Sequence, residues 1–156
     1  MDNSRHSFYS TCDSSENIHA DVRFLGACAL PFWVVTTIQL TVPADATFVG
    51  LVRSTAAHTA AHAHLDMDQI DDLRLAIDEA FALVIGTSGA QGDVSIAFTI
   101  SSHGLDVSLT GPRGVAAPEP GTFAWTILNA LVTDVVSQIN DGQVTISLSS
   151  KAGASA

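Results

Sequence analysis

Residues 66–86 read DMDQIDDLRLAIDEAFALVIG, and this stretch decides the fold. Its apolar side chains recur every three or four residues, which is the period of a helix with one buried face. They are Ile70, Leu73, Ile77, Ala80, Phe81 and Val84. Asp66 and Gln69 have the spacing of a capping box, and Gly86 is a typical helix stop. The stretch therefore predicts an amphipathic helix that begins near Asp66 or Asp68.

Segments with the period of β-strands lie on both sides of this helix. Residues 38–42 alternate apolar side chains with Thr and Gln, which predicts a half-buried strand. Residues 45–64 then have helical spacing and predict a first helix. Its expected stripe is Phe48, Leu51, Val52, Thr55 and Thr59. Downstream, residues 94–100 and 105–109 alternate in the manner of a β-hairpin.

The remaining chain predicts a loop, a third helix and a last strand. Residues 111–121 read GPRGVAAPEPG, and three prolines and three glycines exclude a regular element there. Residues 122–139 are largely apolar and predict a helix that is well buried. Asp141-Gly142 predicts a turn into a strand over residues 144–148.

The order strand, helix, helix, strand, strand, loop, helix, strand predicts an α+β fold. We expect a two-layer sandwich, in which a mostly antiparallel sheet is covered on one face by about three helices. The domain is expected over residues 36–150, with 151–156 as a loose tail. Residues 1–35 are expected to form a separate N-terminal extension that is disordered or follows from an upstream start codon. Phe123 and Trp125 are expected in the core.

The charge balance excludes one class of partner. The formal net charge is −10, and the six basic residues are scattered along the chain. Nucleic-acid binding requires clustered Lys and Arg that replace counterions on the phosphates. We therefore expect no nucleic-acid partner and no anionic membrane surface, whereas a basic protein partner is electrostatically favourable.

Two cysteines and one apolar segment indicate the cellular compartment in which the protein is expected. Cys12 and Cys28 form neither a disulfide framework nor a zinc-ligand spacing, which favours a reduced, cytoplasmic setting. The apolar run 24–35 is shorter than the roughly 20 residues that span a membrane. Residues 25–28 resemble a lipoprotein cleavage box, but the preceding segment is polar, which argues against export.

The stretch from Ile38 to Ile85 resembles the first half of the RsbW family of anti-sigma factor serine kinases. The segment DLRLAIDEA, Asp72 to Ala80, is the most specific part. The segment GTFAWTILNALVTDVV, Gly121 to Val136, is similar to the end of that family's nucleotide site and its last helix. The resemblance covers about residues 36–150 and is closest to the actinobacterial branch. It implies the histidine-kinase-like ATPase fold, a homodimer, and ATP and Mg²⁺ as cofactors.

The resemblance assigns a role to Glu79. In the family, a Glu at this place on the second helix is the general base that acts on a serine of an anti-anti-sigma protein. One turn later the family has an Asn whose side-chain oxygen holds Mg²⁺ against the ATP phosphates. This chain has Leu83 there, and a leucine offers no oxygen to a hard cation. Whether the chain is an enzyme is therefore left open, and no metal site is predicted.

Two further family motifs are eroded. The family reads adenine with an Asp in an Asp-x-Gly-x-Gly turn, where this chain has Leu109 or Thr110, followed by Gly111 and Gly114. Thr110 can offer the base a weak hydrogen bond, but neither Leu109 nor Thr110 replaces a carboxylate.

The phosphate-binding end of the family's site corresponds to Gly121 and Thr122, which open the third helix and present free backbone N–H groups to an anion. Arg113 is the only cation of the lid region.

Three histidines lie near the end of the first helix. His58 and His62 are four residues apart, so both can face one metal ion, and His64 follows. The plainer interpretation is a polar helix face, and the role of the three histidines stays open. A pH-sensitive interface is a further alternative.

These observations favour an anti-sigma factor. It would bind and sequester an alternative sigma factor of the stress or sporulation type, and an anti-anti-sigma partner would relieve it. The alternative hypothesis is an active ATP-dependent serine kinase that phosphorylates the anti-anti-sigma protein. A third is a binding module of the same fold with another regulator as its partner.

Overall fold

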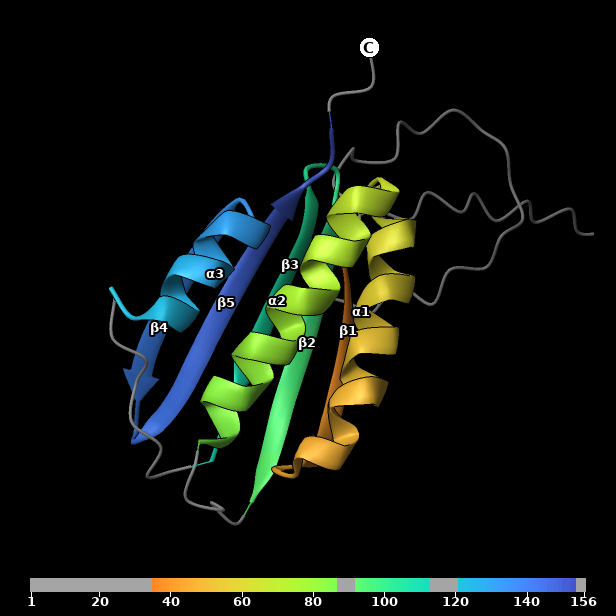
Figure 1. The fold of residues 1–156 in the computed structure, drawn as a ribbon. Coiled ribbons are helices and arrows are strands. Elements are labelled where there is room, and N and C mark those ends of the chain that lie inside the picture. The colour runs from red at the N-terminus through yellow and green to blue at the C-terminus, as the bar shows by residue number, and fades with distance from the viewer. Residues whose placement is uncertain (1–34, 87–91, 113–120, 154–156) are drawn as a thin grey trace, which may run out of the picture. The chain divides into compact units, whose positions relative to one another are not determined.

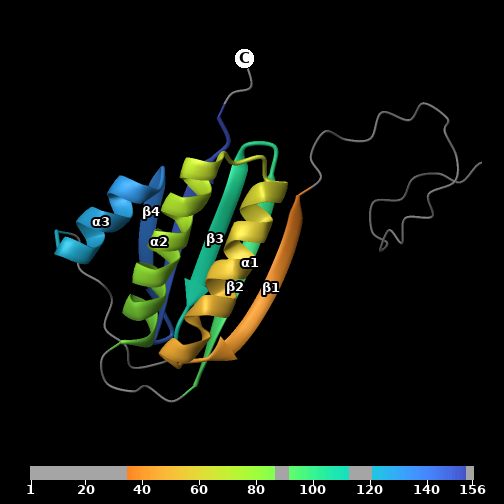
Figure 2. The ribbon, with the colours of Figure 1, turned by 45° about the vertical axis from the view of Figure 1, so that its right-hand side comes forward.

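The computed structural model describes residues 35–86, 92–112 and 121–153. Five antiparallel strands form one sheet in the order β1-β2-β3-β5-β4, and three helices lie on one of its faces (Figure 1). The turned view shows the two layers and the open second face of the sheet (Figure 2). The predicted two-layer α+β sandwich is confirmed. The bounds are β1 Thr36–Pro43, α1 Val49–His62, α2 Met67–Ile85, β2 Asp93–Ser101, β3 Gly104–Thr110, α3 Phe123–Leu131, β4 Asp134–Asn140 and β5 Gln143–Lys151.

Helix α1 packs through small side chains. A short 3-10 turn, η1 (Ala46–Phe48), precedes it, and Asp45 caps that turn by accepting from the Thr47 backbone N–H at 2.8 Å. The buried residues of α1 are Val52, Ala56, Thr59 and Ala60, and they are joined in the core by Ala63. The expected stripe was therefore wrong at two positions, because Phe48 and Leu51 are 36% and 51% exposed. Small side chains let the helix lie close to the sheet, and the two larger ones point outward.

The turn after α1 is a Schellman motif built without glycine. The Leu65 N–H donates to Ala60 O at 3.1 Å and the His64 N–H donates to Ala61 O at 3.2 Å. His64 has φ 59, the left-handed conformation that this turn requires. Leu65 is buried beside it, which fixes the direction in which the chain enters α2.

Helix α2 forms as the sequence predicts. Asp66 accepts from the Gln69 backbone N–H at 2.8 Å, and the Gln69 side chain accepts from the Asp66 N–H at 3.1 Å, so the capping box is complete. The helix ends at Gly86, which has φ 65. Its buried face consists of Leu73, Ala76, Ile77, Ala80, Phe81 and Val84, and Ile70 packs against the same core.

The prediction for residues 122–139 was wrong in its second half. Helix α3 ends at Leu131, the backbone is extended at Val132, and residues 134–140 form β4, antiparallel to β5. The β-branched valines of this segment favour a strand. Asp141 and Gly142 have φ 50 and 77, the primed hairpin turn that joins two strands, so the predicted turn joins β4 to β5.

The core of α3 also differs from expectation. Only Leu128 is buried within this helix. Trp125 is half-buried and packs against the core, whereas Phe123 is 82% exposed and is not a core anchor.

The two faces of the sheet differ sharply. Apolar residues of the strands alternate toward the helices, as Val94, Ile96 and Phe98 do in β2. The opposite, open face carries small polar residues in register across the strands. They include Thr37, Gln39, Thr41, Ser95, Thr99, Ser108, Thr110, Thr145, Ser147 and Ser149. Among the described residues, the hydrophobic core therefore lies on the helix side of the sheet.

Some expectations concern the ends of the domain. Residues 1–34 lie outside the described part of the chain, so the extent of the N-terminal extension stays a prediction. At the other end β5 continues through Lys151, and the Ala152 N–H donates to His103 O at 3.0 Å. Among the described helices, none combines the length and apolar character needed to cross a membrane.

We predict that Asp45 contributes to the stability of the folded domain and that this contribution is lost in acid. The backbone N–H and then the hydroxyl of Thr47 lower the pKa of this carboxyl by donating hydrogen bonds to it. Because the folded-state pKa lies below the unfolded value, the stabilisation is present above about pH 4 and is lost as the pH falls through the folded pKa. Urea unfolding of wild type and Asp45→Asn at pH 6 and pH 2.5 measures this. The advantage of wild type should shrink at pH 2.5, and an unchanged difference would contradict the assignment.

We predict that His64→Gly stabilises the domain by about 1 kcal/mol, because a β-carbon is unfavourable in the left-handed conformation. Urea midpoints at constant m-value test this. His64→Ala is the matched control, since it removes the imidazole and keeps the β-carbon. Stabilisation by both variants would assign the effect to the imidazole instead.

Candidate functional site

The candidate site begins on the outward flank of α2. Glu79 and Leu83 lie one turn apart on this helix, and both are half-buried. Leu83 packs against the hydrophobic core. Glu79 has no hydrogen bond or ion pair to another described residue. The pair thus combines one partly exposed acidic residue with one apolar residue that is part of the packing.

The residue before Glu79 ties α2 to α1. Asp78 Oδ2 accepts from Arg53 Nη1 at 2.7 Å, and both side chains are about one third exposed. Asp78 Oδ1 is buried and has no hydrogen-bond partner among the described residues. The ion pair therefore occupies Arg53 and fixes the α1 side of the site, and it leaves one carboxylate oxygen for a donor from water or a ligand.

The exit of β3 places its last two residues on opposite faces of the sheet. Leu109 is fully buried under the helices. Thr110 points to the open face, where its hydroxyl lies 3.0 Å from the hydroxyl of Thr145 on β5. The structure therefore separates Thr110 from Glu79 and Leu83, which belong to the helix layer.

Gly111 lies directly against the last turn of α2. A β-carbon at this position would come closer to the Val84 side chain and carbonyl oxygen than real β-carbons ever do. The Gly111 N–H donates to Val144 O at 2.8 Å, which holds the segment to β5. Gly92 lies close to Pro112: a β-carbon added at Gly92 would be 3.0 Å from the Pro112 Cβ. The end of α2, the exit of β3 and the entry of β2 are thus packed together.

The start of α3 supplies the remaining predicted residues. Thr122 is the N-cap, and its Oγ1 accepts from the Trp125 N–H at 3.3 Å. Gly121 is exposed with φ 97 and has open space around it. Gly114 and Arg113 lie outside the described residues. Gly111 therefore lies against α2, and the Thr122 hydroxyl caps the start of α3.

The donor set does not fit Mg-ATP in the manner that the sequence resemblance implies. Within residues 35–86, 92–112 and 121–153, no three His, Cys, Asp or Glu side chains come together as metal ligands. Leu83 offers no oxygen, and Thr110 faces away. Among the described residues, the position where the resemblance expects an oxygen ligand for a hard cation is therefore filled by an apolar side chain.

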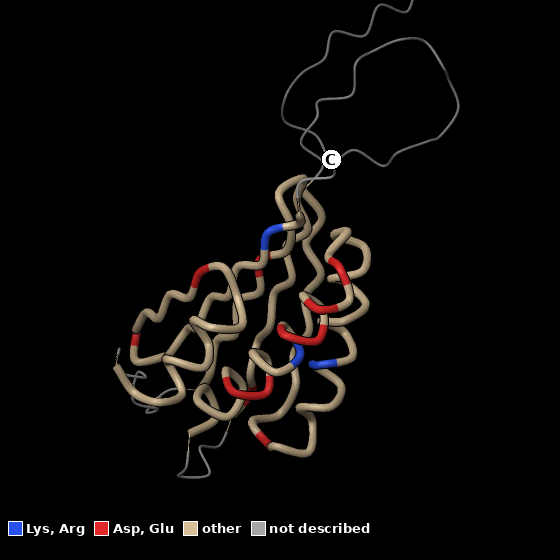
Figure 3. The backbone as a smooth tube through the Cα atoms, turned by 45° about the horizontal axis from the view of Figure 1, so that its top comes forward, with Lys and Arg blue, Asp and Glu red and all other residues tan. Residues whose placement is uncertain are grey.

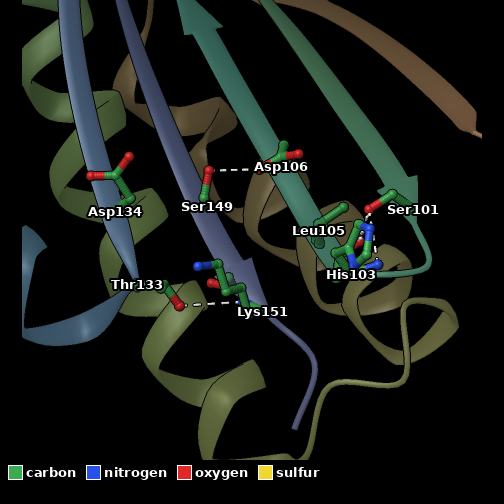
Figure 4. A pocket seen from close by; sticks show the side chains of 10 residues that line it. Ser101, His103, Leu105, Asp106, Thr133, Asp134, Ser149 and Lys151 are labelled. Atoms are coloured by element: carbon green, nitrogen blue, oxygen red, sulfur yellow. Dashed lines mark hydrogen bonds between the residues drawn. The ribbon is translucent and has the colours of Figure 1, made fainter. Parts of the chain in front are cut away.

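A separate depression lies on the open face, at the opposite end of β3 (Figure 4). Its volume is about 520 Å³, and Asp106, Asp134 and Lys151 are among its lining residues. The Ser149 hydroxyl donates to Asp106 at 2.6 Å on its floor. Small-molecule sites are mostly apolar and enclosed. This depression is open and most of its lining residues carry charged or hydroxyl groups, so it is not of that kind.

Acidic positions outnumber basic ones along the described backbone (Figure 3). Two of the basic residues are already engaged: Arg53 pairs with Asp78, and Arg74 pairs with Asp71 at 3.2 Å. The surface around the candidate site therefore favours a partner that carries positive charge.

The chain is similar in sequence to known proteins. No family model matches the chain. The anti-sigma-F factor RsbW of Mycobacterium tuberculosis is 28% identical over 112 residues, which are 70% of this chain and 65% of that protein. The serine-protein kinase RsbW of Bacillus pumilus is 26% identical over 85 residues, 51% of this chain and 52% of that protein. The predicted resemblance to RsbW proteins is confirmed.

A solved structure of similar fold supports the architecture of the domain. The crystal structure of the RsbU and RsbW domains of Rv1364c from Mycobacterium tuberculosis superposes with a TM-score of 0.54 at 17% identity, and the match covers 72% of this chain and 31% of that one. The chain spans just under two thirds of the length of the mycobacterial RsbW and about half of the Bacillus one.

We predict that Gly111→Ala destabilises the domain by several kcal/mol, because the added methyl group forces β3 away from the Val84 carbonyl. Chemical denaturation measures the loss. Gly50→Ala is the matched control, since a β-carbon there meets nothing within 4 Å and should stabilise α1 by about 0.5–1 kcal/mol. Equal effects of the two variants would show that Gly111 is not held against α2.

Proposed function

We propose that this chain is an anti-sigma factor that works without the Mg-ATP site of kinase members. Its function would be to bind an alternative sigma factor of the stress or sporulation type and keep it from RNA polymerase. The observation that carries the proposal is Leu83, which replaces the oxygen ligand of the metal with a side chain packed into the core. The similarity to an anti-sigma-F factor supports the choice of partner.

Release of the sigma factor would come from competition. An anti-anti-sigma protein that binds the same surface shifts the equilibrium only by its own differential affinity, because no phosphorylation step resets the system. We place Glu79 in that surface, since this residue is partly exposed beside the Arg53–Asp78 pair. The acidic surface supports a partner with a basic contact region.

The proposal has three further parts. We propose a homodimer from the family resemblance, a cytoplasmic location from the cysteine usage, and no contact with nucleic acid or membrane. The net charge of −10 supports the last of these, because it repels polyphosphate backbones and anionic lipids.

The second candidate is an active serine kinase. It is favoured by Glu79, which stands at the position of the family's general base, and by the similarity to a serine-protein kinase. This candidate requires that ATP and Mg²⁺ are held by residues other than Leu83 and Thr110. Gly121 and Thr122 would then provide the phosphate-binding end of the site, and Gly111 and Gly114 would belong to the adenine-binding turn.

We predict that the full chain gives no binding heat and no change in Tm with millimolar Mg-ATP, because the metal ligand is missing. Isothermal titration and thermal unfolding measure this. Micromolar binding, with phosphate transfer to an anti-anti-sigma serine that Glu79→Ala abolishes, would establish the kinase instead. Leu83→Asn and the apolar control Leu83→Met separate a regained metal ligand from a packing change.

We predict that the affinity for the cognate sigma factor is the same, within about twofold, with and without Mg-ATP. Titration of each purified alternative sigma factor of the source organism measures it. A tenfold gain with nucleotide would contradict the nucleotide-free mechanism. Failure of every sigma factor to bind would contradict the anti-sigma assignment itself.

A further inference from the structure

Two imidazoles lie side by side on the outer flank of α1. His58 and His62 are one helical turn apart, and both are exposed. Their ring centroids are 4.7 Å apart, and the ring planes make an angle of 71°. Four-residue spacing on a helix directs two side chains to the same flank, so this proximity is built into the helix.

The separation of the rings fits shared coordination. With metal–nitrogen bonds of about 2.0–2.1 Å, two imidazoles in adjacent coordination positions have ring centroids about 4.5–5 Å apart. The observed 4.7 Å lies in that range. The rings now meet edge to face. A change in the soft terminal torsions of the two side chains aims one nitrogen of each ring at a common point.

The surroundings leave the pair accessible. Neither imidazole is hydrogen-bonded or ion-paired with another residue of the described ranges. The neighbouring positions of His58 within α1, three and four residues away, are Ser54, Thr55 and Ala61, which are uncharged. The Ser54 hydroxyl donates to Gly50 O at 2.8 Å and is turned back onto the helix. A solvated ion can therefore approach both rings.

We propose that His58 and His62 form a two-histidine site for a divalent transition-metal ion. Imidazole nitrogens select ions such as Zn²⁺, Ni²⁺ and Cu²⁺ over Mg²⁺ and Ca²⁺, which require oxygen ligands. No third protein ligand is near within the described parts of the chain, so water completes the coordination. Affinity follows the usual order, with Cu²⁺ bound more tightly than Ni²⁺ and Zn²⁺.

The site acts on the end of α1. His62 is the last residue of the helix, and the Schellman turn to α2 follows immediately. A metal that links His58 to His62 clamps the final turn and binds the folded chain in preference to the unfolded one. Occupancy therefore raises the Tm of the domain. This effect is independent of sigma-factor binding and of nucleotide.

The test titrates Zn²⁺, Ni²⁺ and Cu²⁺ separately into the full chain, with isothermal titration and thermal unfolding as readouts. We expect one ion per chain at the pair and a rise in Tm. His58→Gln and His62→Gln should each weaken binding at least tenfold, since either one reduces the chelate to a single ligand. The double variant should bind no more tightly than either single variant. Cys12 and Cys28 are common to all variants, so differences between variants report the histidine pair.

Two controls keep the test specific. His103→Gln removes an exposed imidazole from the β2–β3 turn and should leave binding unchanged. The double variant Ser54→His, His58→Gln keeps two exposed histidines on α1 but sets them two turns apart, about 12 Å along the axis, and should bind as weakly as His58→Gln. Zn²⁺ should shift the ring NMR signals of His58 and His62 together. Unaltered binding in either single His→Gln variant, or no binding at millimolar metal, would overturn the proposal.

Discussion

The packing of α2 on the sheet is the contact on which the rest of the structure depends. Its apolar stripe, from Leu73 to Val84, is buried, and burial of the Leu, Ile, Phe and Val side chains in it contributes about 1.5–3 kcal/mol each. Helices α1 and α3 lie on either side of it (Figures 1 and 2). Gly111 lies against Val84 at the point where α2 ends and β3 leaves the sheet, and it has no β-carbon that would collide there. The same helix carries Glu79 and Leu83, so the candidate site is set by the core.

Sequence periodicity predicts those elements whose side chains have one unambiguous period. The capping box and stripe of α2 fix its ends to within a residue of the observed ones, and the β2–β3 hairpin follows from strict alternation. The helix predicted over residues 132–139 was wrong, because adjacent valines fit a helical and an extended pattern equally. The decisive signal was the Asp141-Gly142 turn, which joins two strands and therefore requires one before it. In α1, the sequence did not reveal that alanines, rather than Phe48 and Leu51, face the core.

The sequence reveals which residues occupy the candidate site, but it reveals less about how they are arranged in space. The identity of Leu83 already removes a metal ligand, and this needs no coordinates. That Thr110 faces away from α2 follows from the alternation of β3, because Leu109 faces inward. The buried oxygen of Asp78 and the contact of Gly111 with Val84 depend on how helices and strands meet, which no local pattern encodes.

The strand order also shapes how the chain must be made. β5 lies between β3 and β4 although it follows both in sequence. While a ribosome is still synthesising the segment before residue 143, β1, β2 and β3 can pair in succession, but β3 keeps one edge of unsatisfied backbone groups and β4 has no neighbour. Such an edge recruits strands from other chains. A nascent chain of this fold is thus exposed to aggregation until its last strand is released, and a delay in translation over residues 134–151 prolongs that interval.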